Sequence, residues 1–184
     1  MTAEEPDAPW LVVIDPQRIF AEPPSPWAAP AFDAIVGPVR RLADAHAGRV
    51  VVTRFVAPER PEGSWVPYYR AWPFAQVPDG DPLYEIMPAL RDVPAAVVAE
   101  PTFGKWTPAL RAVTGATPHL RLAGAATDCC VLSTALAAAD GGARVDVVVD
   151  ACAGSSEENH RRALDAMALY APQITLVTTE EVLA

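Results

Sequence analysis

Six short runs of apolar residues recur along the chain, and segments with a different spacing separate them. An apolar run of about four to eight residues, bounded by polar or turn-forming residues, is typical of a buried strand. The first run, "PWLVVID", covers residues 9–15 and ends at an acid. The pattern predicts further strands over residues 49–55, 95–100, 119–125, 144–150 and 174–179.

Between these runs, apolar residues at helical spacing predict helices. The predicted helices cover residues 31–47, 83–91, 107–113 and 156–170, and one more follows residue 127. Residues 56–82 break the alternation, because they contain six prolines and five aromatic residues. We expect this segment to be a long ordered loop, and loops of this length in compact domains tend to be functional.

Apolar strands that alternate with helices favour an α/β fold with a parallel sheet covered on both faces. The chain shows no internal repeat, no low-complexity tract and no linker, so residues 1–184 are expected to form one domain. In open parallel sheets, ligands bind beyond the carboxyl ends of the strands. Residues that follow the predicted strands are therefore the first candidates for a site.

The amino-acid composition and net charge indicate which kinds of binding partner are expected. The 184 residues are 51% hydrophobic and 20% charged, with a formal net charge of -9 and a pI near 4.7. An acidic surface repels phosphate backbones and anionic lipid, so neither nucleic acid nor a membrane is expected as a partner. The amino-terminal residues "MTAEEPDAPW" are acidic and lack a basic or a long apolar stretch, so no export signal is expected. Three cysteines, two of them adjacent, favour free thiols in a reducing cytoplasm.

Three reactive residue types converge on the carboxyl edge of the predicted sheet. Asp15 ends the first strand, Lys105 follows the third, and Cys129 and Cys130 follow the fourth. Each has an ordinary structural interpretation: a turn-capping acid, a solvated amine, and small buried thiols. The position of the strand ends, which does not depend on residue type, places all three at one edge of the sheet. This convergence favours a catalytic interpretation.

A thiol, an amine and an acid suit nucleophilic catalysis. A free thiol with a pKa near ~8.5 is only about 3% thiolate at neutral pH. An ammonium about 4 Å away contributes about 4 kcal/mol at an effective dielectric constant near 20. We expect Lys105 and the start of the following helix to lower the thiol pKa. Asp15 is expected to accept the thiol proton and pass it to a leaving amine, while backbone N–H groups hold the oxyanion.

The segments "VVIDPQRIF", "TFGKW" and "GAATDCCVLSTALAAADGGARVDVVVDACAG" resemble the isochorismatase-like cysteine hydrolases. That superfamily includes nicotinamidases and N-carbamoylsarcosine amidase. The resemblance spans nearly the whole chain, and the last segment is the specific one. It implies a three-layer α/β/α sandwich around a six-stranded, mainly parallel, doubly wound sheet.

The resemblance also implies roles for individual residues. Asp15 matches the proton-shuttling acid, and Lys105 matches the lysine that lowers the thiol pKa. The family places its nucleophile directly before a valine, which selects Cys130 and leaves Cys129 as packing or pocket wall. A non-proline cis peptide is implied between Ala125 and Ala126, with an oxyanion hole made by the backbone N–H groups of Ala126 and Cys130.

This chain departs from the family pattern in two ways, and both restrict the reaction that the resemblance implies. Metal-binding nicotinamidases carry Asp-x-His and a further histidine after the second strand, where this chain reads "TRFVAPERPEGSWVPYY" without a histidine. No metal and no cofactor are therefore expected, and surface roles are expected for His46, His119 and His160. Isochorismatases proper cleave a vinyl ether and generally lack the nucleophilic cysteine. Its presence here favours hydrolysis of a C–N bond in a small amide or carbamoyl substrate.

Several aromatic residues are candidates for the pocket wall. Substrate contact is expected for Phe20, Tyr69, Trp72 and Trp106, although aromatic residues also anchor long loops. Asp128 is interpreted as an N-cap. The family resemblance implies a homodimer or homotetramer.

Two other classes of function are compatible with an α/β sheet of this kind. A receiver-like phosphoacceptor domain needs paired acids after the first strand and an aspartate ending the third, and this chain has "IDPQ" and Glu100 instead. A catalytically silent scaffold or small-ligand-binding domain stays open. Rapid alkylation of Cys130 by iodoacetamide near neutral pH is the expected mark of an enzyme, and a thiol inert until pH ~9 that of a scaffold.

Overall fold

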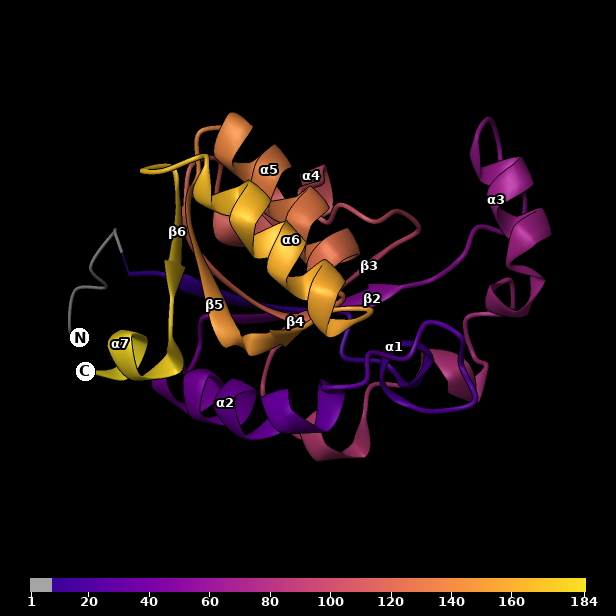
Figure 1. Cartoon of the computed structure of the whole chain (residues 1–184), viewed down its shortest axis with the longest axis horizontal. Coiled ribbons are helices and arrows are strands. Elements are labelled where there is room, and N and C mark those ends of the chain that lie inside the picture. Colours follow the sequence, from indigo (N-terminus) through magenta and orange to yellow (C-terminus); the bar gives the residue numbers. More distant parts are fainter. Residues whose placement is uncertain (1–7) are drawn as a thin grey trace.

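In the computed structural model, which describes residues 8–184, six strands form one sheet in the order β3-β2-β1-β4-β5-β6 (Figure 1). All neighbouring strands in it pair in parallel. The strands are β1 (Trp10–Ile14), β2 (Val50–Phe55), β3 (Ala96–Glu100), β4 (His119–Ala125), β5 (Arg144–Ala153) and β6 (Ile174–Val177). The six predicted strands and the α/β class are confirmed. The amino-terminal residues 1–7, on which the expectation about an export signal depends, lie outside the described residues.

Helices cover both faces of the sheet, which gives the expected three layers. Figure 1 shows α2 (Phe32–Ala45) and α7 (Thr179–Leu183) on one face. On the other face lie α4 (Pro108–Thr114), α5 (Leu132–Asp140) and α6 (Glu157–Ala168). Each face has its own hydrophobic cluster: Phe32 and Leu42 of α2 belong to one, and Ala135 of α5 and Met167 of α6 to the other. Two short helices, α1 (Arg18–Ala21) and α3 (Trp65–Ala71), lie beyond the ends of β1 and β2.

Local sequence signals account for where several helices begin. The Ser156 hydroxyl accepts a hydrogen bond from the Asn159 N–H at 3.1 Å and caps α6. Thr178 and Glu181 form a reciprocal capping box at α7. Pro108 occupies the first turn of α4, where a missing N–H costs no hydrogen bond.

Two sequence expectations need correction in the segment between β2 and β3. The predicted helix over residues 83–91 is instead two 3-10 turns, η2 (Pro82–Tyr84) and η3 (Pro88–Leu90). Pro88 prevents a continuous α-helix, because it lacks an N–H and its ring would clash with the preceding turn. The expected loop over residues 56–82 contains α3 and a 3-10 turn, η1 (Pro73–Ala75).

The helix expected after β4 starts with a wider turn. Residues Thr127–Val131, labelled η4, form a π-helical turn, and α5 continues from Leu132. Single π turns inside helices occur frequently at functional sites. Within residues 8–184, no helix combines the length and the apolar character that crossing a bilayer requires.

The close approach of β1 and β4 depends on one glycine. Gly124 has a φ of +112°, and a Cβ at this position would lie 2.7 Å from the backbone nitrogen of Ile14 and closer still to its carbonyl oxygen. Only glycine fits this conformation and this contact. The glycine therefore brings the end of β4 against the end of β1, directly beside Asp15.

Candidate active site

Asp15 is held at the end of β1 by the neighbouring strand. Its φ of 44° places the residue in the left-handed region, and its side chain is fully buried. The Thr53 hydroxyl of β2 donates to Asp15 Oδ1 at 2.6 Å and accepts from the Asp15 N–H at 3.0 Å. These two hydrogen bonds set the orientation of the carboxylate.

Lys105 reaches the same carboxylate from the segment after β3. Its Nζ lies 3.0 Å from Asp15 Oδ2, and neither side chain is exposed to solvent. The ammonium also donates to the Thr102 carbonyl at 2.7 Å and lies 5.6 Å from the centroid of the Phe55 ring. A buried ion pair recovers its desolvation cost only when further polar contacts satisfy both charges. Here the Thr53 hydroxyl donates to the carboxylate, and the Thr102 carbonyl accepts from the ammonium.

Asp15 Oδ2 has a second feature. Apart from the ion contact with Lys105, this buried oxygen receives no hydrogen bond from the described residues. Unsatisfied buried polar atoms are uncommon in native structures and often have a functional explanation. The oxygen therefore has a lone pair available to accept a proton.

Cys130 lies in the π turn that follows β4. The peptide bond between Ala125 and Ala126 is cis, which confirms that expectation. Thr134 of α5 links this turn to the lysine segment, because its hydroxyl donates to the Cys130 carbonyl at 2.6 Å and accepts from the Lys105 N–H at 2.9 Å. Outside the ladders of helices and strands, neither the Ala126 N–H nor the Cys130 N–H donates to another described residue. Both groups are thus candidates for binding an oxyanion.

The protonation state of Cys130 corrects one sequence expectation. Burial raises the pKa of this thiol well above its ordinary value, and the nearby Asp15 carboxylate raises it further. The Lys105 ammonium lowers the pKa, as expected, but it does not outweigh the other two causes. The net shift favours the neutral thiol over the thiolate. A nucleophilic role then requires the proton to leave during attack rather than beforehand.

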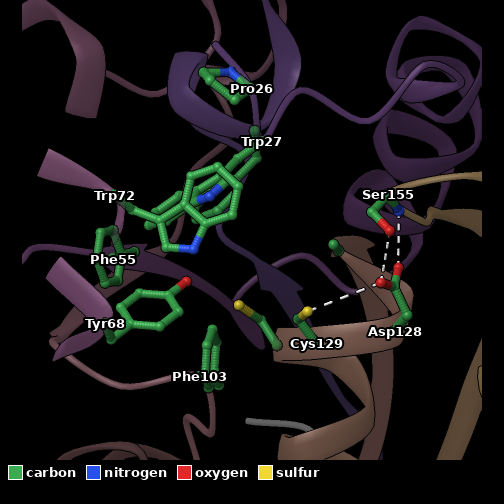
Figure 2. A pocket seen from close by; sticks show the side chains of 12 residues that line it. Pro26, Trp27, Phe55, Tyr68, Trp72, Phe103, Asp128, Cys129 and Ser155 are labelled. Carbon is green, nitrogen blue, oxygen red and sulfur yellow. Dashed lines mark hydrogen bonds between the residues drawn. The ribbon is translucent and has the colours of Figure 1, made fainter. Parts of the chain in front are cut away.

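Cys129 has different surroundings from its neighbour. Burial first, and then the Asp128 carboxylate, raise the pKa of Cys129 to about 11. Its Sγ donates to Asp128 Oδ2 at 3.8 Å (Figure 2). Among the described ion pairs, none places an ammonium or guanidinium on Asp128. Cys129 thus lies beside Asp128, and this acid has no lysine partner of the kind that Lys105 provides for Asp15.

Asp128 is not the N-cap that the sequence suggested. It lies within the π turn, and its carboxylate accepts two hydrogen bonds from Ser155, from the backbone N–H at 2.7 Å and from the hydroxyl at 2.7 Å. These bonds join the turn after β4 to the loop after β5. The carboxylate faces a cavity rather than the start of a helix (Figure 2).

The cavity, which we call the aromatic pocket, has a volume of about 320 Å³ and adjoins both cysteines (Figure 2). One wall contains Ala126, Asp128, Cys129, Cys130 and Ser155. Aromatic rings dominate the rest of the lining, and they are Phe20, Trp27, Phe55, Tyr68, Trp72 and Phe103. The expected pocket residues Phe20 and Trp72 are therefore part of it.

Tyr69 and Trp106, unlike Phe20 and Trp72, do not line this pocket, and substrate contact by either stays a prediction. Adjacent residues on a helix point about 100° apart, and α3 directs Tyr68 into the pocket. Tyr69 instead is buried, with its ring 6.0 Å from that of Trp65. Trp106 packs against the end of α5 at Gly141, and the Arg111 guanidinium lies 5.9 Å from its ring.

The histidines occupy structural positions rather than a cluster. His46 is buried, which corrects the expected surface role, and it contacts Arg121 at 3.0 Å. His119 contacts Asp146 at 2.6 Å, and His160 contacts the Thr127 hydroxyl at 2.8 Å. Among residues 8–184, no three His, Cys, Asp or Glu side chains are grouped so as to hold a metal ion.

Sequence reasoning missed several residues of this site. Thr53 was visible as a polar residue near the end of an apolar strand, and the parallel register of β1 and β2 places it beside the end of β1. Thr134 and the ring contacts of Trp27 had no comparable signal, because their partners are distant in the sequence.

Solved structures with the same fold include proteins named as hydrolases. A search of curated protein sequences gave no significant match. A cysteine hydrolase from Pseudomonas syringae pv. phaseolicola is 22% identical, with a TM-score of 0.80 over 96% of this chain and 91% of that one. A pyrazinamidase from Pyrococcus horikoshii, solved in complex with zinc, is 24% identical, with a TM-score of 0.71 over 91% and 97%. At these identities the likeness concerns the fold.

A third solved structure is an isochorismatase-like hydrolase from Alkaliphilus metalliredigens. It is 16% identical, with a TM-score of 0.75, and the match covers 98% of this chain and 97% of that one. The family model described as the isochorismatase domain matches residues 9–181 of this chain. The chain therefore belongs to the isochorismatase family of hydrolases.

Proposed function

We propose that the protein is a metal-independent cysteine hydrolase that cleaves the C–N bond of a small, non-peptide amide or carbamoyl compound. Cys130 is the nucleophile, and Asp15 and Lys105 complete the catalytic group. The observation that carries the proposal is the fully buried ion pair, 3.0 Å long, next to a pocket that Cys130 lines. An apolar pair of the same size would be at least as stabilising in a purely structural role.

The reaction begins with coupled proton transfer and attack. The Cys130 thiol gives its proton to Asp15 Oδ2 as Sγ bonds to the substrate carbonyl carbon. The free lone pair on that oxygen supports this step. Lys105 stabilises the carboxylate beforehand and the developing thiolate during attack. The raised thiol pKa keeps the nucleophile protonated until substrate arrives.

The tetrahedral intermediate places its negative charge on the former carbonyl oxygen. The backbone N–H groups of Ala126 and Cys130 donate to this oxyanion. Asp15 then returns its proton to the leaving nitrogen, the C–N bond breaks, and ammonia or a small amine departs. A thioester on Cys130 remains.

Hydrolysis of the thioester repeats the proton transfers with water as the nucleophile. Asp15 accepts a proton from the water, the C–O bond forms, and the C–S bond breaks. The proton passes to the sulfur, which restores the neutral thiol and releases the acid product. No metal or cofactor takes part, and the scattered histidines of the described residues support this part of the proposal.

The alternative function, a catalytically silent scaffold, needs a different test from neutral-pH alkylation. Because burial and Asp15 raise the pKa of Cys130, its thiol is expected to react slowly near pH 7 in an enzyme as well as in a scaffold. Ammonia release from a panel of small primary amides, together with intact-mass detection of an acyl adduct, separates the two.

Matched cysteine variants then test the assignment of the nucleophile. Cys130→Ser is expected to lose turnover and the acyl adduct, and Cys129→Ser to keep most of both. Loss of turnover in Cys129→Ser, with turnover retained in Cys130→Ser, would show that the nucleophile is the other thiol. An intact wild-type protein that releases no ammonia and forms no adduct with any amide would favour the scaffold.

A further inference from the structure

The aromatic pocket has a one-sided charge composition. Among the described residues that line it, Asp128 alone carries a formal charge. Lys105 is fully buried and paired with Asp15, so this pair adds no net charge. Arg54, near the end of β2, is paired with Asp79 at 2.7 Å and is not part of the lining. The pocket therefore offers no cation to a substrate carboxylate.

The Asp128 carboxylate is held rigidly and still has acceptor capacity. Ser155 donates one hydrogen bond to each carboxylate oxygen, and the Asn159 side chain donates to the Ser155 hydroxyl at 2.9 Å. A carboxylate oxygen accepts about two hydrogen bonds. Oδ2 also accepts from Cys129 Sγ at 3.8 Å, and Oδ1 keeps a free lone pair. Within residues 8–184, Asp128 forms no salt bridge with a basic side chain. A negative charge thus remains unneutralised at the pocket wall.

Aromatic rings face this carboxylate across the pocket. Figure 2 shows Trp27, Trp72 and Tyr68 on the side opposite Asp128, with Cys129 between them. Trp27 packs against the other two, with centroid distances of 5.8 Å to Tyr68 and 5.9 Å to Trp72. Aromatic faces attract cations, and groups of them recognise quaternary ammonium ligands. The net charge of -9 also raises the local concentration of cations near the protein.

From this arrangement we propose the substrate class: a small amide whose non-reacting end carries a positive charge, an ammonium or quaternary ammonium group. The inference rests on the proposed function and names the chemistry at the far end of its substrate. The charged group lies among the rings of Trp27, Trp72 and Tyr68 and interacts with the Asp128 carboxylate. The amide carbonyl then lies at Cys130. Amides that carry a carboxylate are rejected, because the carboxylate would meet Asp128 without a counter-charge.

Three amides of similar size test the proposal. Trimethylammonioacetamide and 3,3-dimethylbutanamide differ only in having a quaternary nitrogen or a carbon at the branch point, and succinamate carries a carboxylate. Binding is measured by isothermal titration calorimetry on the Cys130→Ala variant, which removes the nucleophile and keeps the pocket. The cationic amide is expected to bind at least tenfold more tightly than its neutral isostere, and succinamate more weakly than both.

A pair of charge variants in the Cys130→Ala background identifies the source of the preference. Asp128→Asn keeps an acceptor for Ser155 and is expected to reduce the cation preference at least fivefold. Asp140→Asn, at the exposed end of α5, makes the same change of net charge and is expected to leave the preference unaltered. Equal affinity for the cationic and neutral amides, no binding by any of the three, or an unchanged preference in Asp128→Asn would overturn the inference.

The test separates this inference from the proposed function. Wild-type protein that releases ammonia from the neutral amide, without a cation preference in binding, retains the hydrolase and refutes the substrate class. A cation preference in Cys130→Ala without ammonia release from wild type supports the pocket chemistry and contradicts hydrolysis.

Discussion

Breaking the buried ion pair gives a prediction that does not depend on the substrate. Lys105→Met removes the ammonium while keeping most of the side-chain length. It leaves the Asp15 carboxylate with one hydrogen bond, from Thr53, and leaves the Thr102 carbonyl without its donor. Removing one partner of a buried pair costs about 3–5 kcal/mol, because the remaining charge has no compensation.

The reverse change and the double change complete a thermodynamic cycle. Asp15→Asn keeps an oxygen for the Thr53 hydroxyl, and Lys105 keeps the Thr102 carbonyl and the Phe55 ring. We therefore expect Asp15→Asn to cost less than Lys105→Met, about 2–3 kcal/mol. The double variant contains no buried charge at this place. Its expected cost is about 1–2 kcal/mol, below that of either single variant.

Urea unfolding followed by far-UV circular dichroism measures these free energies. With a slope of about 2 kcal/mol per molar, the midpoint of Lys105→Met should fall by about 2 M and that of the double variant by less than ~1 M. If Lys105→Met does not fold but the double variant does, the result agrees with the same reasoning, because only the single variant keeps an uncompensated buried charge. Additive effects of the two substitutions would refute it, since they would mean that the charges do not interact.

Two further predictions concern the thiol and the sheet. Asp15 raises the pKa of Cys130, and Lys105 lowers it. The pH at which the alkylation rate of Cys130 is half-maximal should therefore move down in Asp15→Asn and up in Lys105→Met. A shift in the same direction in both variants would contradict this electrostatic account. Gly124→Ala should destabilise the protein by about 2–5 kcal/mol through backbone overlap and strain. The control Gly37→Ala, in open space on α2, gains helix propensity but places a Cβ before Pro38, so it should change the stability by less than about 1 kcal/mol. Thermal unfolding that ranks the two variants the other way would reject the packing argument.

The strands and the position of the candidate site followed from local patterns. The strands are apolar runs, and the flanking helices bury the central ones on both faces, as the burial of β1 illustrates, whereas the edge strand β3 is largely exposed. Parallel strands share one carboxyl edge, so residues that follow different strands meet there. Asp15 and Lys105, ninety positions apart, accordingly lie 3.0 Å from each other. Their roles in catalysis stay predictions.

The pocket lining was less predictable. In α3, neighbouring tyrosines have the same local signal, and only the packing of the helix against Trp27 and Phe103 determines that Tyr68 faces the pocket. The same reason applies to Trp106, which follows Lys105 directly but packs against α5. Asp128 had the sequence features of an N-cap, but its partner comes from the loop after β5.

The sequence alone therefore determined the succession of six strands along the chain, the parallel α/β class and the position of Asp15, Lys105 and Cys130 beyond the strand ends. These depend on the spacing of apolar residues over a few positions, and that spacing acts within each segment. Tertiary structure decided the charge state of Cys130, the partners of Asp128 and which aromatic rings enclose the pocket. Burial, electrostatic neighbours and ring contacts join segments far apart in the chain, so no local pattern encodes them.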